Sequence, residues 1–217
     1  MELFSNKIRI KERNHISYKK DTDIQKSCFG DIDKNNHFEV ISGGIAMRRI
    51  AQFFKVSREQ FVGAMREEFP DYSPEEIDKI YDALILPCRA TKGSAGYDFF
   101  APFSFTLPAG ATIKIPTGIR VKMEEDWVLK VYPRSGLGFK YRLQMNNTVG
   151  IIDSDYYFSD NEGHIFIKMT NASTEGKTVE VSAGSGFAQG IFLEYGITVD
   201  DAAEGIRNGG FGSTTTK

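Results

Sequence analysis

The sequence predicts a mainly β protein in which a small helical segment precedes the β domain. Apolar residues recur at helical spacing between about residues 45 and 85. After Pro87 they alternate with polar residues at strand spacing, and turns rich in Gly, Asn, Asp and Pro separate the runs. Many short strands of this kind are typical of a sandwich, barrel or jelly roll. We therefore expect an N-terminal extension over 1–85 and a β domain over 86–217.

The extension is expected to be helical from about residue 45. Its first two stretches are 45–56 and the run that begins with Ser57 and Gln60, which are spaced as in a capping box. Their apolar stripes are Met47, Ile50 and Phe54 in the first and Phe61, Met65 and Phe69 in the second.

A third helix is predicted from Ser73. Ser73 is a good N-cap, Pro74 suits the first helical position, and the next two residues are acidic, which suits the positive end of the helix dipole. Its apolar stripe is Ile77, Ile80, Tyr81 and Leu84. Pro87 is expected to stop it.

Alternation then marks a series of strands. The clearest inward-facing sets are Ile119, Val121 and Met123, then Trp127, Leu129 and Val131, then Ile165, Ile167 and Met169. Two more apolar runs follow, at 178–182 and 190–195. The chain ends in a Gly-rich polar stretch, about 205–217, that we expect to be a flexible tail unless a ligand orders it.

Charge and composition exclude several classes of protein. The formal net charge of the 217 residues is −2, which gives no overall attraction to nucleic acid or to an anionic membrane. No signal peptide and no apolar run of membrane-spanning length are present, so a cytoplasmic protein is expected. The histidines are scattered, and Cys28 and Cys88 have neither zinc-site nor disulfide-framework spacing. The basic stretch 45–66 is offset by the acidic stretch 67–82, which favours helix packing over DNA reading.

Five stretches carry residues suited to a nucleotide site. They are AGYDFFA (95–101), PRSGLG (133–138), GIIDSDYY (150–157), GFAQ (186–189) and GGFGSTT (209–215). Arginine offers a bidentate fork for phosphate oxygens, serine a hydroxyl donor, and glycine lets backbone N–H groups approach an anion. A carboxylate within hydrogen-bond reach of water can accept its proton. Each stretch taken alone is more often structural than functional.

In this order, the five stretches resemble the motifs of the trimeric dUTP diphosphatase (dUTPase) family, over about residues 84–217. The resemblance implies a dUTPase-like jelly-roll or β-clip subunit and a homotrimer with shared active sites. It implies hydrolysis of dUTP to dUMP and pyrophosphate, by Mg²⁺-assisted in-line attack of water at the α-phosphate. The metal would be held mainly by the substrate triphosphate.

The resemblance also implies the catalytic residues. Asp153 matches the carboxylate that activates the attacking water, and Gln189 the amide that holds the same water. Ser135 would lie near the bridging oxygen that leaves. Asp98 would support the metal and phosphate region, contacting Mg²⁺ through water. The neighbouring Asp155 is expected to be structural.

Substrate-binding residues follow in the same way. Arg134, Ser135 and Gly136 match phosphate binders, and Tyr156 the ring that packs on deoxyribose and excludes a 2′-hydroxyl. The hairpin that reads uracil would use Asn147 and the backbone of Gly150, Ile151 and Ile152, leading into Asp153. The tail would close over the uracil with Phe211 and over the phosphates with Arg207, Gly212 and Ser213.

Four departures from the family pattern stand out. Gly186 occupies the place of an arginine, and Arg207 stands four rather than five residues before Phe211. The connection after Tyr156 is several residues longer than usual, over 157–163. The N-terminal extension is also longer than the family's usual start.

Two alternatives to this activity are open. One is a nucleotide-binding regulator that uses the helical extension as a partner surface. The other is a dCTP deaminase, which needs a glutamate on the strand after the nucleotide hairpin, where this chain has HIFIKMT.

Overall fold

The computed structural model describes residues 48–205 and residue 207. Expectations for 1–47, 206 and 208–217, including Phe211, Gly212, Ser213 and most of the predicted tail, lie outside the described residues. The elements are β1 (Ala51–Lys55), α2 (Arg58–Glu68), α3 (Pro74–Asp82), β2 (Cys88–Arg89), β3 (Tyr97–Phe100), β4 (Phe105–Leu107), β5 (Thr112–Pro116), β6 (Ile119–Met123), β7 (Trp127–Pro133), α4 (Ser135–Tyr141), β8 (Leu143–Met145), β9 (Gly150–Ile152), the 3₁₀ helix η1 (Ser154–Phe158), β10 (Phe166–Asn171), β11 (Val179–Val181) and β12 (Gly186–Glu194).

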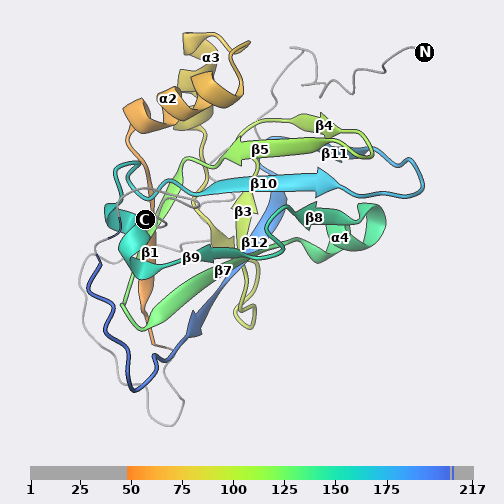
Figure 1. The fold of residues 1–217 in the computed structure, drawn as a ribbon. Coiled ribbons are helices and arrows are strands. Elements are labelled where there is room, and N and C mark those ends of the chain that lie inside the picture. The colour runs from red at the N-terminus through yellow and green to blue at the C-terminus, as the bar shows by residue number, and fades with distance from the viewer. Residues whose placement is uncertain (1–47, 206, 208–217) are drawn as a thin grey trace.

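The strands form antiparallel sheets that enclose one hydrophobic core, with α2 and α3 at one end of the molecule (Figure 1). The largest sheet has the order β2-β3-β12-β7-β9, and a second has the order β5-β10-β8. The predicted alternation is confirmed in β6, where Ile119, Val121 and Met123 are buried. The mainly β fold that the sequence predicts is therefore confirmed.

Helices α2 and α3 are confirmed and pack on the same core as the strands. Phe61, Met65 and Ile77 are almost fully buried, as the helical stripes predict. The Ser57 side chain accepts a hydrogen bond from the Gln60 N–H, and Ser73 forms a complete capping box with Glu76. The two helices therefore belong to the folded unit and are not an appendage.

The predicted helix over 45–56 is wrong at its centre, because residues Ala51–Lys55 form strand β1. β1 pairs antiparallel with β6, with Phe53 opposite Val121. Phe53 is buried and packs edge-on against Phe99 at a ring-centroid distance of 5.9 Å. A partner 68 residues later in the chain therefore overrides the local helical spacing.

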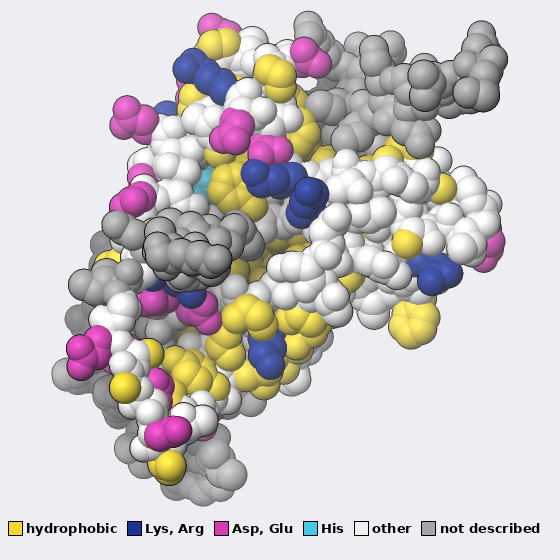
Figure 2. Space-filling view, in the orientation of Figure 1, with side chains coloured by type: hydrophobic (Ala, Val, Ile, Leu, Met, Phe, Trp, Pro, Cys, Tyr) yellow, Lys and Arg dark blue, Asp and Glu magenta, His cyan; other side chains and the backbone are white. Residues whose placement is uncertain are grey.

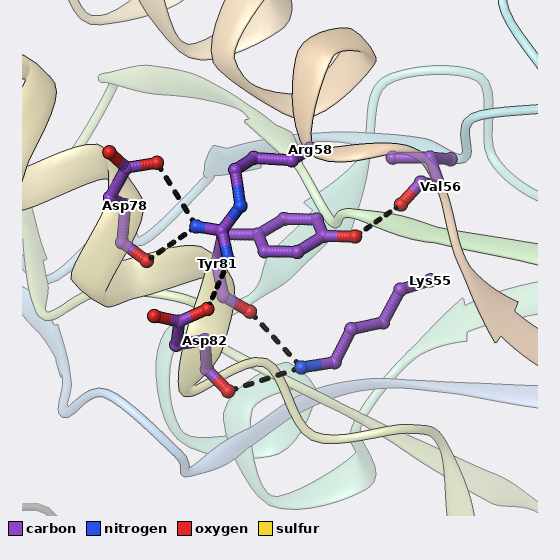
Figure 3. A network of polar contacts seen from close by, with 6 residues as sticks. All are labelled: Lys55, Val56, Arg58, Asp78, Tyr81 and Asp82. Atoms are coloured by element: carbon purple, nitrogen blue, oxygen red, sulfur yellow. Dashed lines mark hydrogen bonds and ion pairs between the residues drawn. The ribbon is translucent and has the colours of Figure 1, made fainter.

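A polar network fixes β1 and α2 against α3 (Figure 3). Lys55 donates to the backbone carbonyls of Tyr81 and Asp82, 3.1 Å each, at the C-terminal end of α3. Arg58 lies 4.5 Å from the Tyr81 ring and pairs with Asp78 and Asp82. The Tyr81 hydroxyl in turn donates to the Val56 carbonyl at 2.8 Å. These contacts hold the first three elements together.

The described helices are all too short and too polar to cross a membrane.

Candidate active site

One group of predicted site residues gathers on adjacent strands of the large sheet. Asp98 on β3 is the direct cross-strand partner of Gln189 on β12. Arg134, at the end of β7, places its Nε 3.3 Å from the Asp98 carboxylate. Ser135 and Gly136 follow at the exposed start of α4, a short helix that the sequence analysis did not predict. The structure thus brings Asp98, Arg134 and Gln189 together, and we call them the phosphate-side group.

Gly186 has a steric role in this group. The Arg134 side chain lies over it, and a Cβ at this position would stand 2.7 Å from Arg134 Nη1. Gly96 makes room for the Gln189 side-chain amide in the same way, because a Cβ at position 96 would stand 3.0 Å from Gln189 Oε1. The departure from the family pattern at Gly186 therefore makes room for an arginine that comes from another strand.

The β8–β9 connection, between two strands that belong to different sheets, forms one wall of a pocket of about 530 Å³. Asn147, Gly150 and Ile152 line it, as three of the predicted uracil-binding residues. The exposed Ile151 is not among the lining residues. The turn is tight, with Thr148 at φ 64°, in the left-handed region. This connection therefore places backbone polar groups at the edge of a cavity that can take a small ligand.

Another part of the pocket lining comes from β5 and from residues in and before β10. Lys114 and Lys168, which are direct cross-strand partners, line it together with Phe166. Figure 2 shows Lys and Arg side chains beside a recess with a hydrophobic floor on this face of the molecule. Sequence reasoning missed this part of the lining because none of these residues belongs to a motif.

Asp153 follows β9 and caps the 3₁₀ helix η1 with an extended backbone. Its carboxylate pairs with Arg207, whose Nε also lies 2.9 Å from Asp155 Oδ1. The Asp153 side chain stays 41% exposed, so water can still reach it. The predicted base and the predicted tail arginine are therefore in contact, and Asp155 shares that arginine.

Tyr156 is buried, with 3% of its surface exposed, and it is not among the residues that line the pocket. Its hydroxyl donates to the His164 carbonyl at 2.7 Å and accepts from Asn161 Nδ2 at 2.8 Å. Burial raises the pKa of the Tyr156 phenol, although the Asn161 hydrogen bond and Arg207 act in the opposite direction. The ring is thus held firmly behind the pocket wall.

The sheet register separates Asp153 from Gln189 within one chain. Gln189 pairs with Tyr132 of β7, and Ile152 pairs with Leu129, so Asp153 comes level with Val128. Four residues along β7 and two strand spacings correspond to about 16 Å between the two backbones. One water molecule cannot bridge that gap between side chains that stand off the sheet. Asp153 therefore does not join the phosphate-side group of its own chain.

Among the described residues, no cluster of three or more His, Cys, Asp or Glu side chains could hold a metal ion. Asp98 is the carboxylate of the phosphate-side group, and its side chain is 17% exposed. Carboxylates and phosphate oxygens are the ligands that Mg²⁺ prefers. The donor set is therefore suited to a cation that a bound phosphate chain carries in with it.

Comparisons with known proteins agree with this geometry. The dUTPase family model matches residues 82–215. The deoxyuridine 5′-triphosphate nucleotidohydrolase of Lactococcus lactis is 39% identical over 144 residues, which cover 64% of this chain and 95% of the relative. The corresponding protein of Pasteurella multocida is 39% identical over 152 residues, with 64% and 96% covered.

A solved structure extends the comparison to the fold. The crystal structure of dUTPase from Streptococcus mutans superposes with a TM-score of 0.50 at 33% sequence identity, covering 69% of this chain and 98% of that one. β1 and α2 precede the residues that the family model matches. Motifs, fold and relatives lead to one conclusion: the chain belongs to the dUTPase family.

Proposed function

We propose that the protein hydrolyses dUTP to dUMP and pyrophosphate, with Mg²⁺, at active sites shared between the subunits of a homotrimer. The observation that carries this proposal is the pocket at the β8–β9 connection, which adjoins the segment that bears Asp153. The relatives named above carry this activity in their names, and membership of the family supports it for this chain.

The chemistry assigned to the residues follows from their types and places. Asp153 accepts a proton from a water molecule, and the resulting hydroxide attacks the α-phosphorus. The bond to the α,β-bridging oxygen breaks, and its electron pair leaves with pyrophosphate. Arg134 offsets phosphate charge, and Ser135 donates to the leaving oxygen. Bound Mg²⁺ would neutralise the charge of the triphosphate, with Asp98 as a partner through water.

A shared site is supported by the sheet register. Since Asp153 and Gln189 lie about 16 Å apart in one chain, they can act on one water only if they come from different copies. The remaining tail residues, Phe211, Gly212 and Ser213, are proposed to close the site once substrate is bound. The same closure requires Arg207 to leave Asp153 for the phosphates.

The first experiment measures pyrophosphate release from dUTP, UTP, dCTP and dTTP, with and without Mg²⁺. We expect turnover of dUTP alone, and only with the metal. Ammonia release from dCTP would favour the deaminase instead. That alternative lacks support in the structure, because Glu162, before β10, uses its carboxylate to accept two hydrogen bonds from Ser57.

A second experiment tests the shared site by mixing two inactive variants, Asp153→Asn and Gln189→Ala, after dissociation and reassociation. A site that takes one residue from each copy becomes intact in about a quarter of random combinations, so the mixture regains activity. A site within one chain stays inactive in every combination. No recovery in confirmed mixed trimers would contradict the proposal. Nucleotide binding without turnover, together with a bound partner at α2 and α3, would instead favour a regulator.

A further inference from the structure

The long connection over 157–163 contributes a residue to the pocket. Asn161 lines the pocket together with Asn147, Gly150 and Ile152 of the β8–β9 segment. Its neighbour Glu162 has φ 59° and Gly163 has φ 69°, so the chain turns sharply through two left-handed residues. The turn places the Asn161 side chain in the pocket lining, although Asn161 belongs to no helix or strand.

The hydrogen bonds of Asn161 can be assigned from its partners. The Tyr156 hydroxyl donates to the His164 carbonyl, so it must accept from the amide nitrogen of Asn161. The amide oxygen accepts from the Gly163 N–H at 3.2 Å. An asparagine side chain can donate twice and accept twice. Described residues use one of each, which leaves one donor and one acceptor for a ligand in the pocket.

Asn161 is well placed to meet the sugar. In the proposed function the β8–β9 connection binds the base, and the water activated by Asp153 attacks the α-phosphate, so the sugar lies between them. Asn161 is bonded to Tyr156, three residues after Asp153. Tyr156 itself is almost fully buried. The amide of Asn161 is therefore a polar group of the pocket lining that is linked to the segment bearing Asp153 and can face the sugar.

Helix α2 holds this loop from outside the pocket. The Ser57 hydroxyl and N–H donate to the two Glu162 carboxylate oxygens at 2.6 and 2.7 Å. Arg120 adds to the anchor, because it donates to the Tyr157 carbonyl at 2.6 Å and lies 3.7 Å from Glu162 Oε2. These contacts lower the pKa of the Glu162 carboxyl although burial acts to raise it. The loop thus carries a fixed negative charge at the helix N-terminus.

The other end of α2 contacts a residue that lines the same pocket. Glu68, the last residue of the helix, pairs with Lys114, and Lys114 lines the pocket. The Lys114 ammonium also lies 4.8 Å from the centre of the Phe166 ring. A helix that precedes the family-matching residues therefore contacts Lys114 of the pocket lining and the loop that carries Asn161.

We propose that Asn161 hydrogen-bonds the 3′-hydroxyl of the bound deoxynucleotide, and that α2 positions it through Ser57 and Glu162. This inference rests on the proposed function, because it takes the pocket as the nucleoside site. It gives the N-terminal segment a specific part in substrate recognition, and it makes Asn161 a binding residue outside the five motifs. Ser57 and Glu162 are positioning residues.

The test is a thermodynamic cycle, measured on the full chain. One change removes the Asn161 side chain, and the other removes the 3′-hydroxyl of the nucleotide. dUTP and its 2′,3′-dideoxy analogue differ only in the 3′-hydroxyl. Wild type should prefer dUTP in kcat/KM by about three- to tenfold, the value of one hydrogen bond. Asn161→Ala should lose that preference, lowering kcat/KM for dUTP and leaving the dideoxy analogue almost unchanged. Equal losses on both nucleotides would overturn the assignment.

Two capping serines provide a matched comparison for α2. Ser57→Ala and Ser73→Ala each remove one helix cap, but only Ser57 also holds Glu162. Ser57→Ala should reduce the preference for the 3′-hydroxyl and increase amide hydrogen exchange over 157–163. Ser73→Ala should change neither. The positioning role is refuted if the two variants behave alike.

Calorimetry measures the affinity of the same variants for both nucleotides. These affinities give the same thermodynamic cycle without relying on turnover. A chain that binds dUTP with the expected preference but releases no pyrophosphate would contradict the proposed activity and still support Asn161. If the chain hydrolyses dUTP but Asn161→Ala affects both nucleotides equally, the proposed activity is supported and the assignment of Asn161 is contradicted.

Discussion

The phosphate-side group and the nucleoside pocket are built in different ways. Asp98, Arg134 and Gln189 are positioned by regular strand pairing, and their neighbours are fixed by the register of β3, β12 and β7. The pocket depends on irregular backbone, with Thr148, Glu162 and Gly163 in left-handed conformations. It also depends on α2, which lies far from it in sequence. A short motif can therefore specify the first region, whereas the second needs contacts that no local pattern contains.

The largest effect is expected at Asp153, at the edge of the nucleoside region. Asp153→Asn keeps the size of the side chain but cannot accept a proton, so kcat should fall by about two to four orders of magnitude. Binding of dUTP should change little. Single-turnover hydrolysis and equilibrium binding measure the two effects separately. Asp155→Asn is the matched control, because it loses only the ion pair with Arg207. An inactive Asp155→Asn beside an active Asp153→Asn would show that the assigned positions in this motif are wrong.

The next effect concerns the backbone of the pocket loop. A Cβ at Gly163 would stand 2.7 Å from the Tyr156 carbonyl oxygen, at φ 69°. Gly163→Ala should therefore lower the free energy of unfolding by about 2–4 kcal/mol. Gly176 has φ 70° but open space around it, so Gly176→Ala should cost only about 1 kcal/mol. Urea unfolding compares the two; similar losses would mean that the clash at Gly163 is relieved.

A smaller effect should appear with pH through His164, which is fully buried behind the pocket. Burial lowers its pKa from 6.5 to about 3, with Lys114 acting in the same direction and Glu162 opposing it. Below about pH 6.5 the unfolded chain binds a proton that the folded chain does not. The free energy of unfolding should therefore fall by up to about 1.4 kcal/mol per pH unit as the pH drops toward 3.

Urea unfolding of wild type and His164→Gln between neutral and acidic pH measures this contribution. Glutamine does not titrate and can still accept the Gly118 N–H bond that His164 Nε2 accepts at 2.8 Å. The variant should show a shallower decline with falling pH. Identical declines would assign the acid sensitivity to other groups.

The smallest effect is expected in the phosphate-side group, at Gly186. A methyl group there meets the end of the Arg134 side chain, which can move, so stability should change little. Displacing the guanidinium should weaken, not abolish, its charge-assisted hydrogen bond to phosphate, which is worth about 1.5–3 kcal/mol when intact, so KM for dUTP should rise several-fold. In an Arg134→Ala background, Gly186→Ala should have no further effect. An equal effect of Gly186→Ala in the wild-type and Arg134→Ala backgrounds would show that Gly186 does not act through Arg134.

The sequence predicted strands β6, β7, β10, β11 and β12, because alternation reports burial on one face of a sheet. It also predicted α2 and α3, whose stripes and N-caps are local signals. The region of β1 was predicted as helix because Met47, Ile50 and Phe54 have helical spacing. Its actual conformation follows from pairing with β6, which local spacing does not encode.

The candidate site was predictable where a motif marks it and not elsewhere. Asp98, Arg134 and Gln189 were predicted from motifs, and the structure brings them together. Asn161 and Lys114 have no such pattern and enter the pocket through the fold of a loop and a strand. Two residues of DNEG, Glu162 and Gly163, adopt the left-handed turn. The signals available for this loop were its turn-prone composition and the extra length of 157–163.

Strand β1 also bears on how the chain avoids self-association. Within the part of the chain that the structure describes, β6 pairs with β1 and with no other strand. A fragment that began at residue 82, where the family model starts, would leave the backbone N–H and C=O groups of β6 open along an apolar edge. Open edges of this kind recruit strands from other molecules. Production of this protein for study should therefore start ahead of Ala51, since the shorter fragment is a candidate for aggregation and amyloid-like stacking.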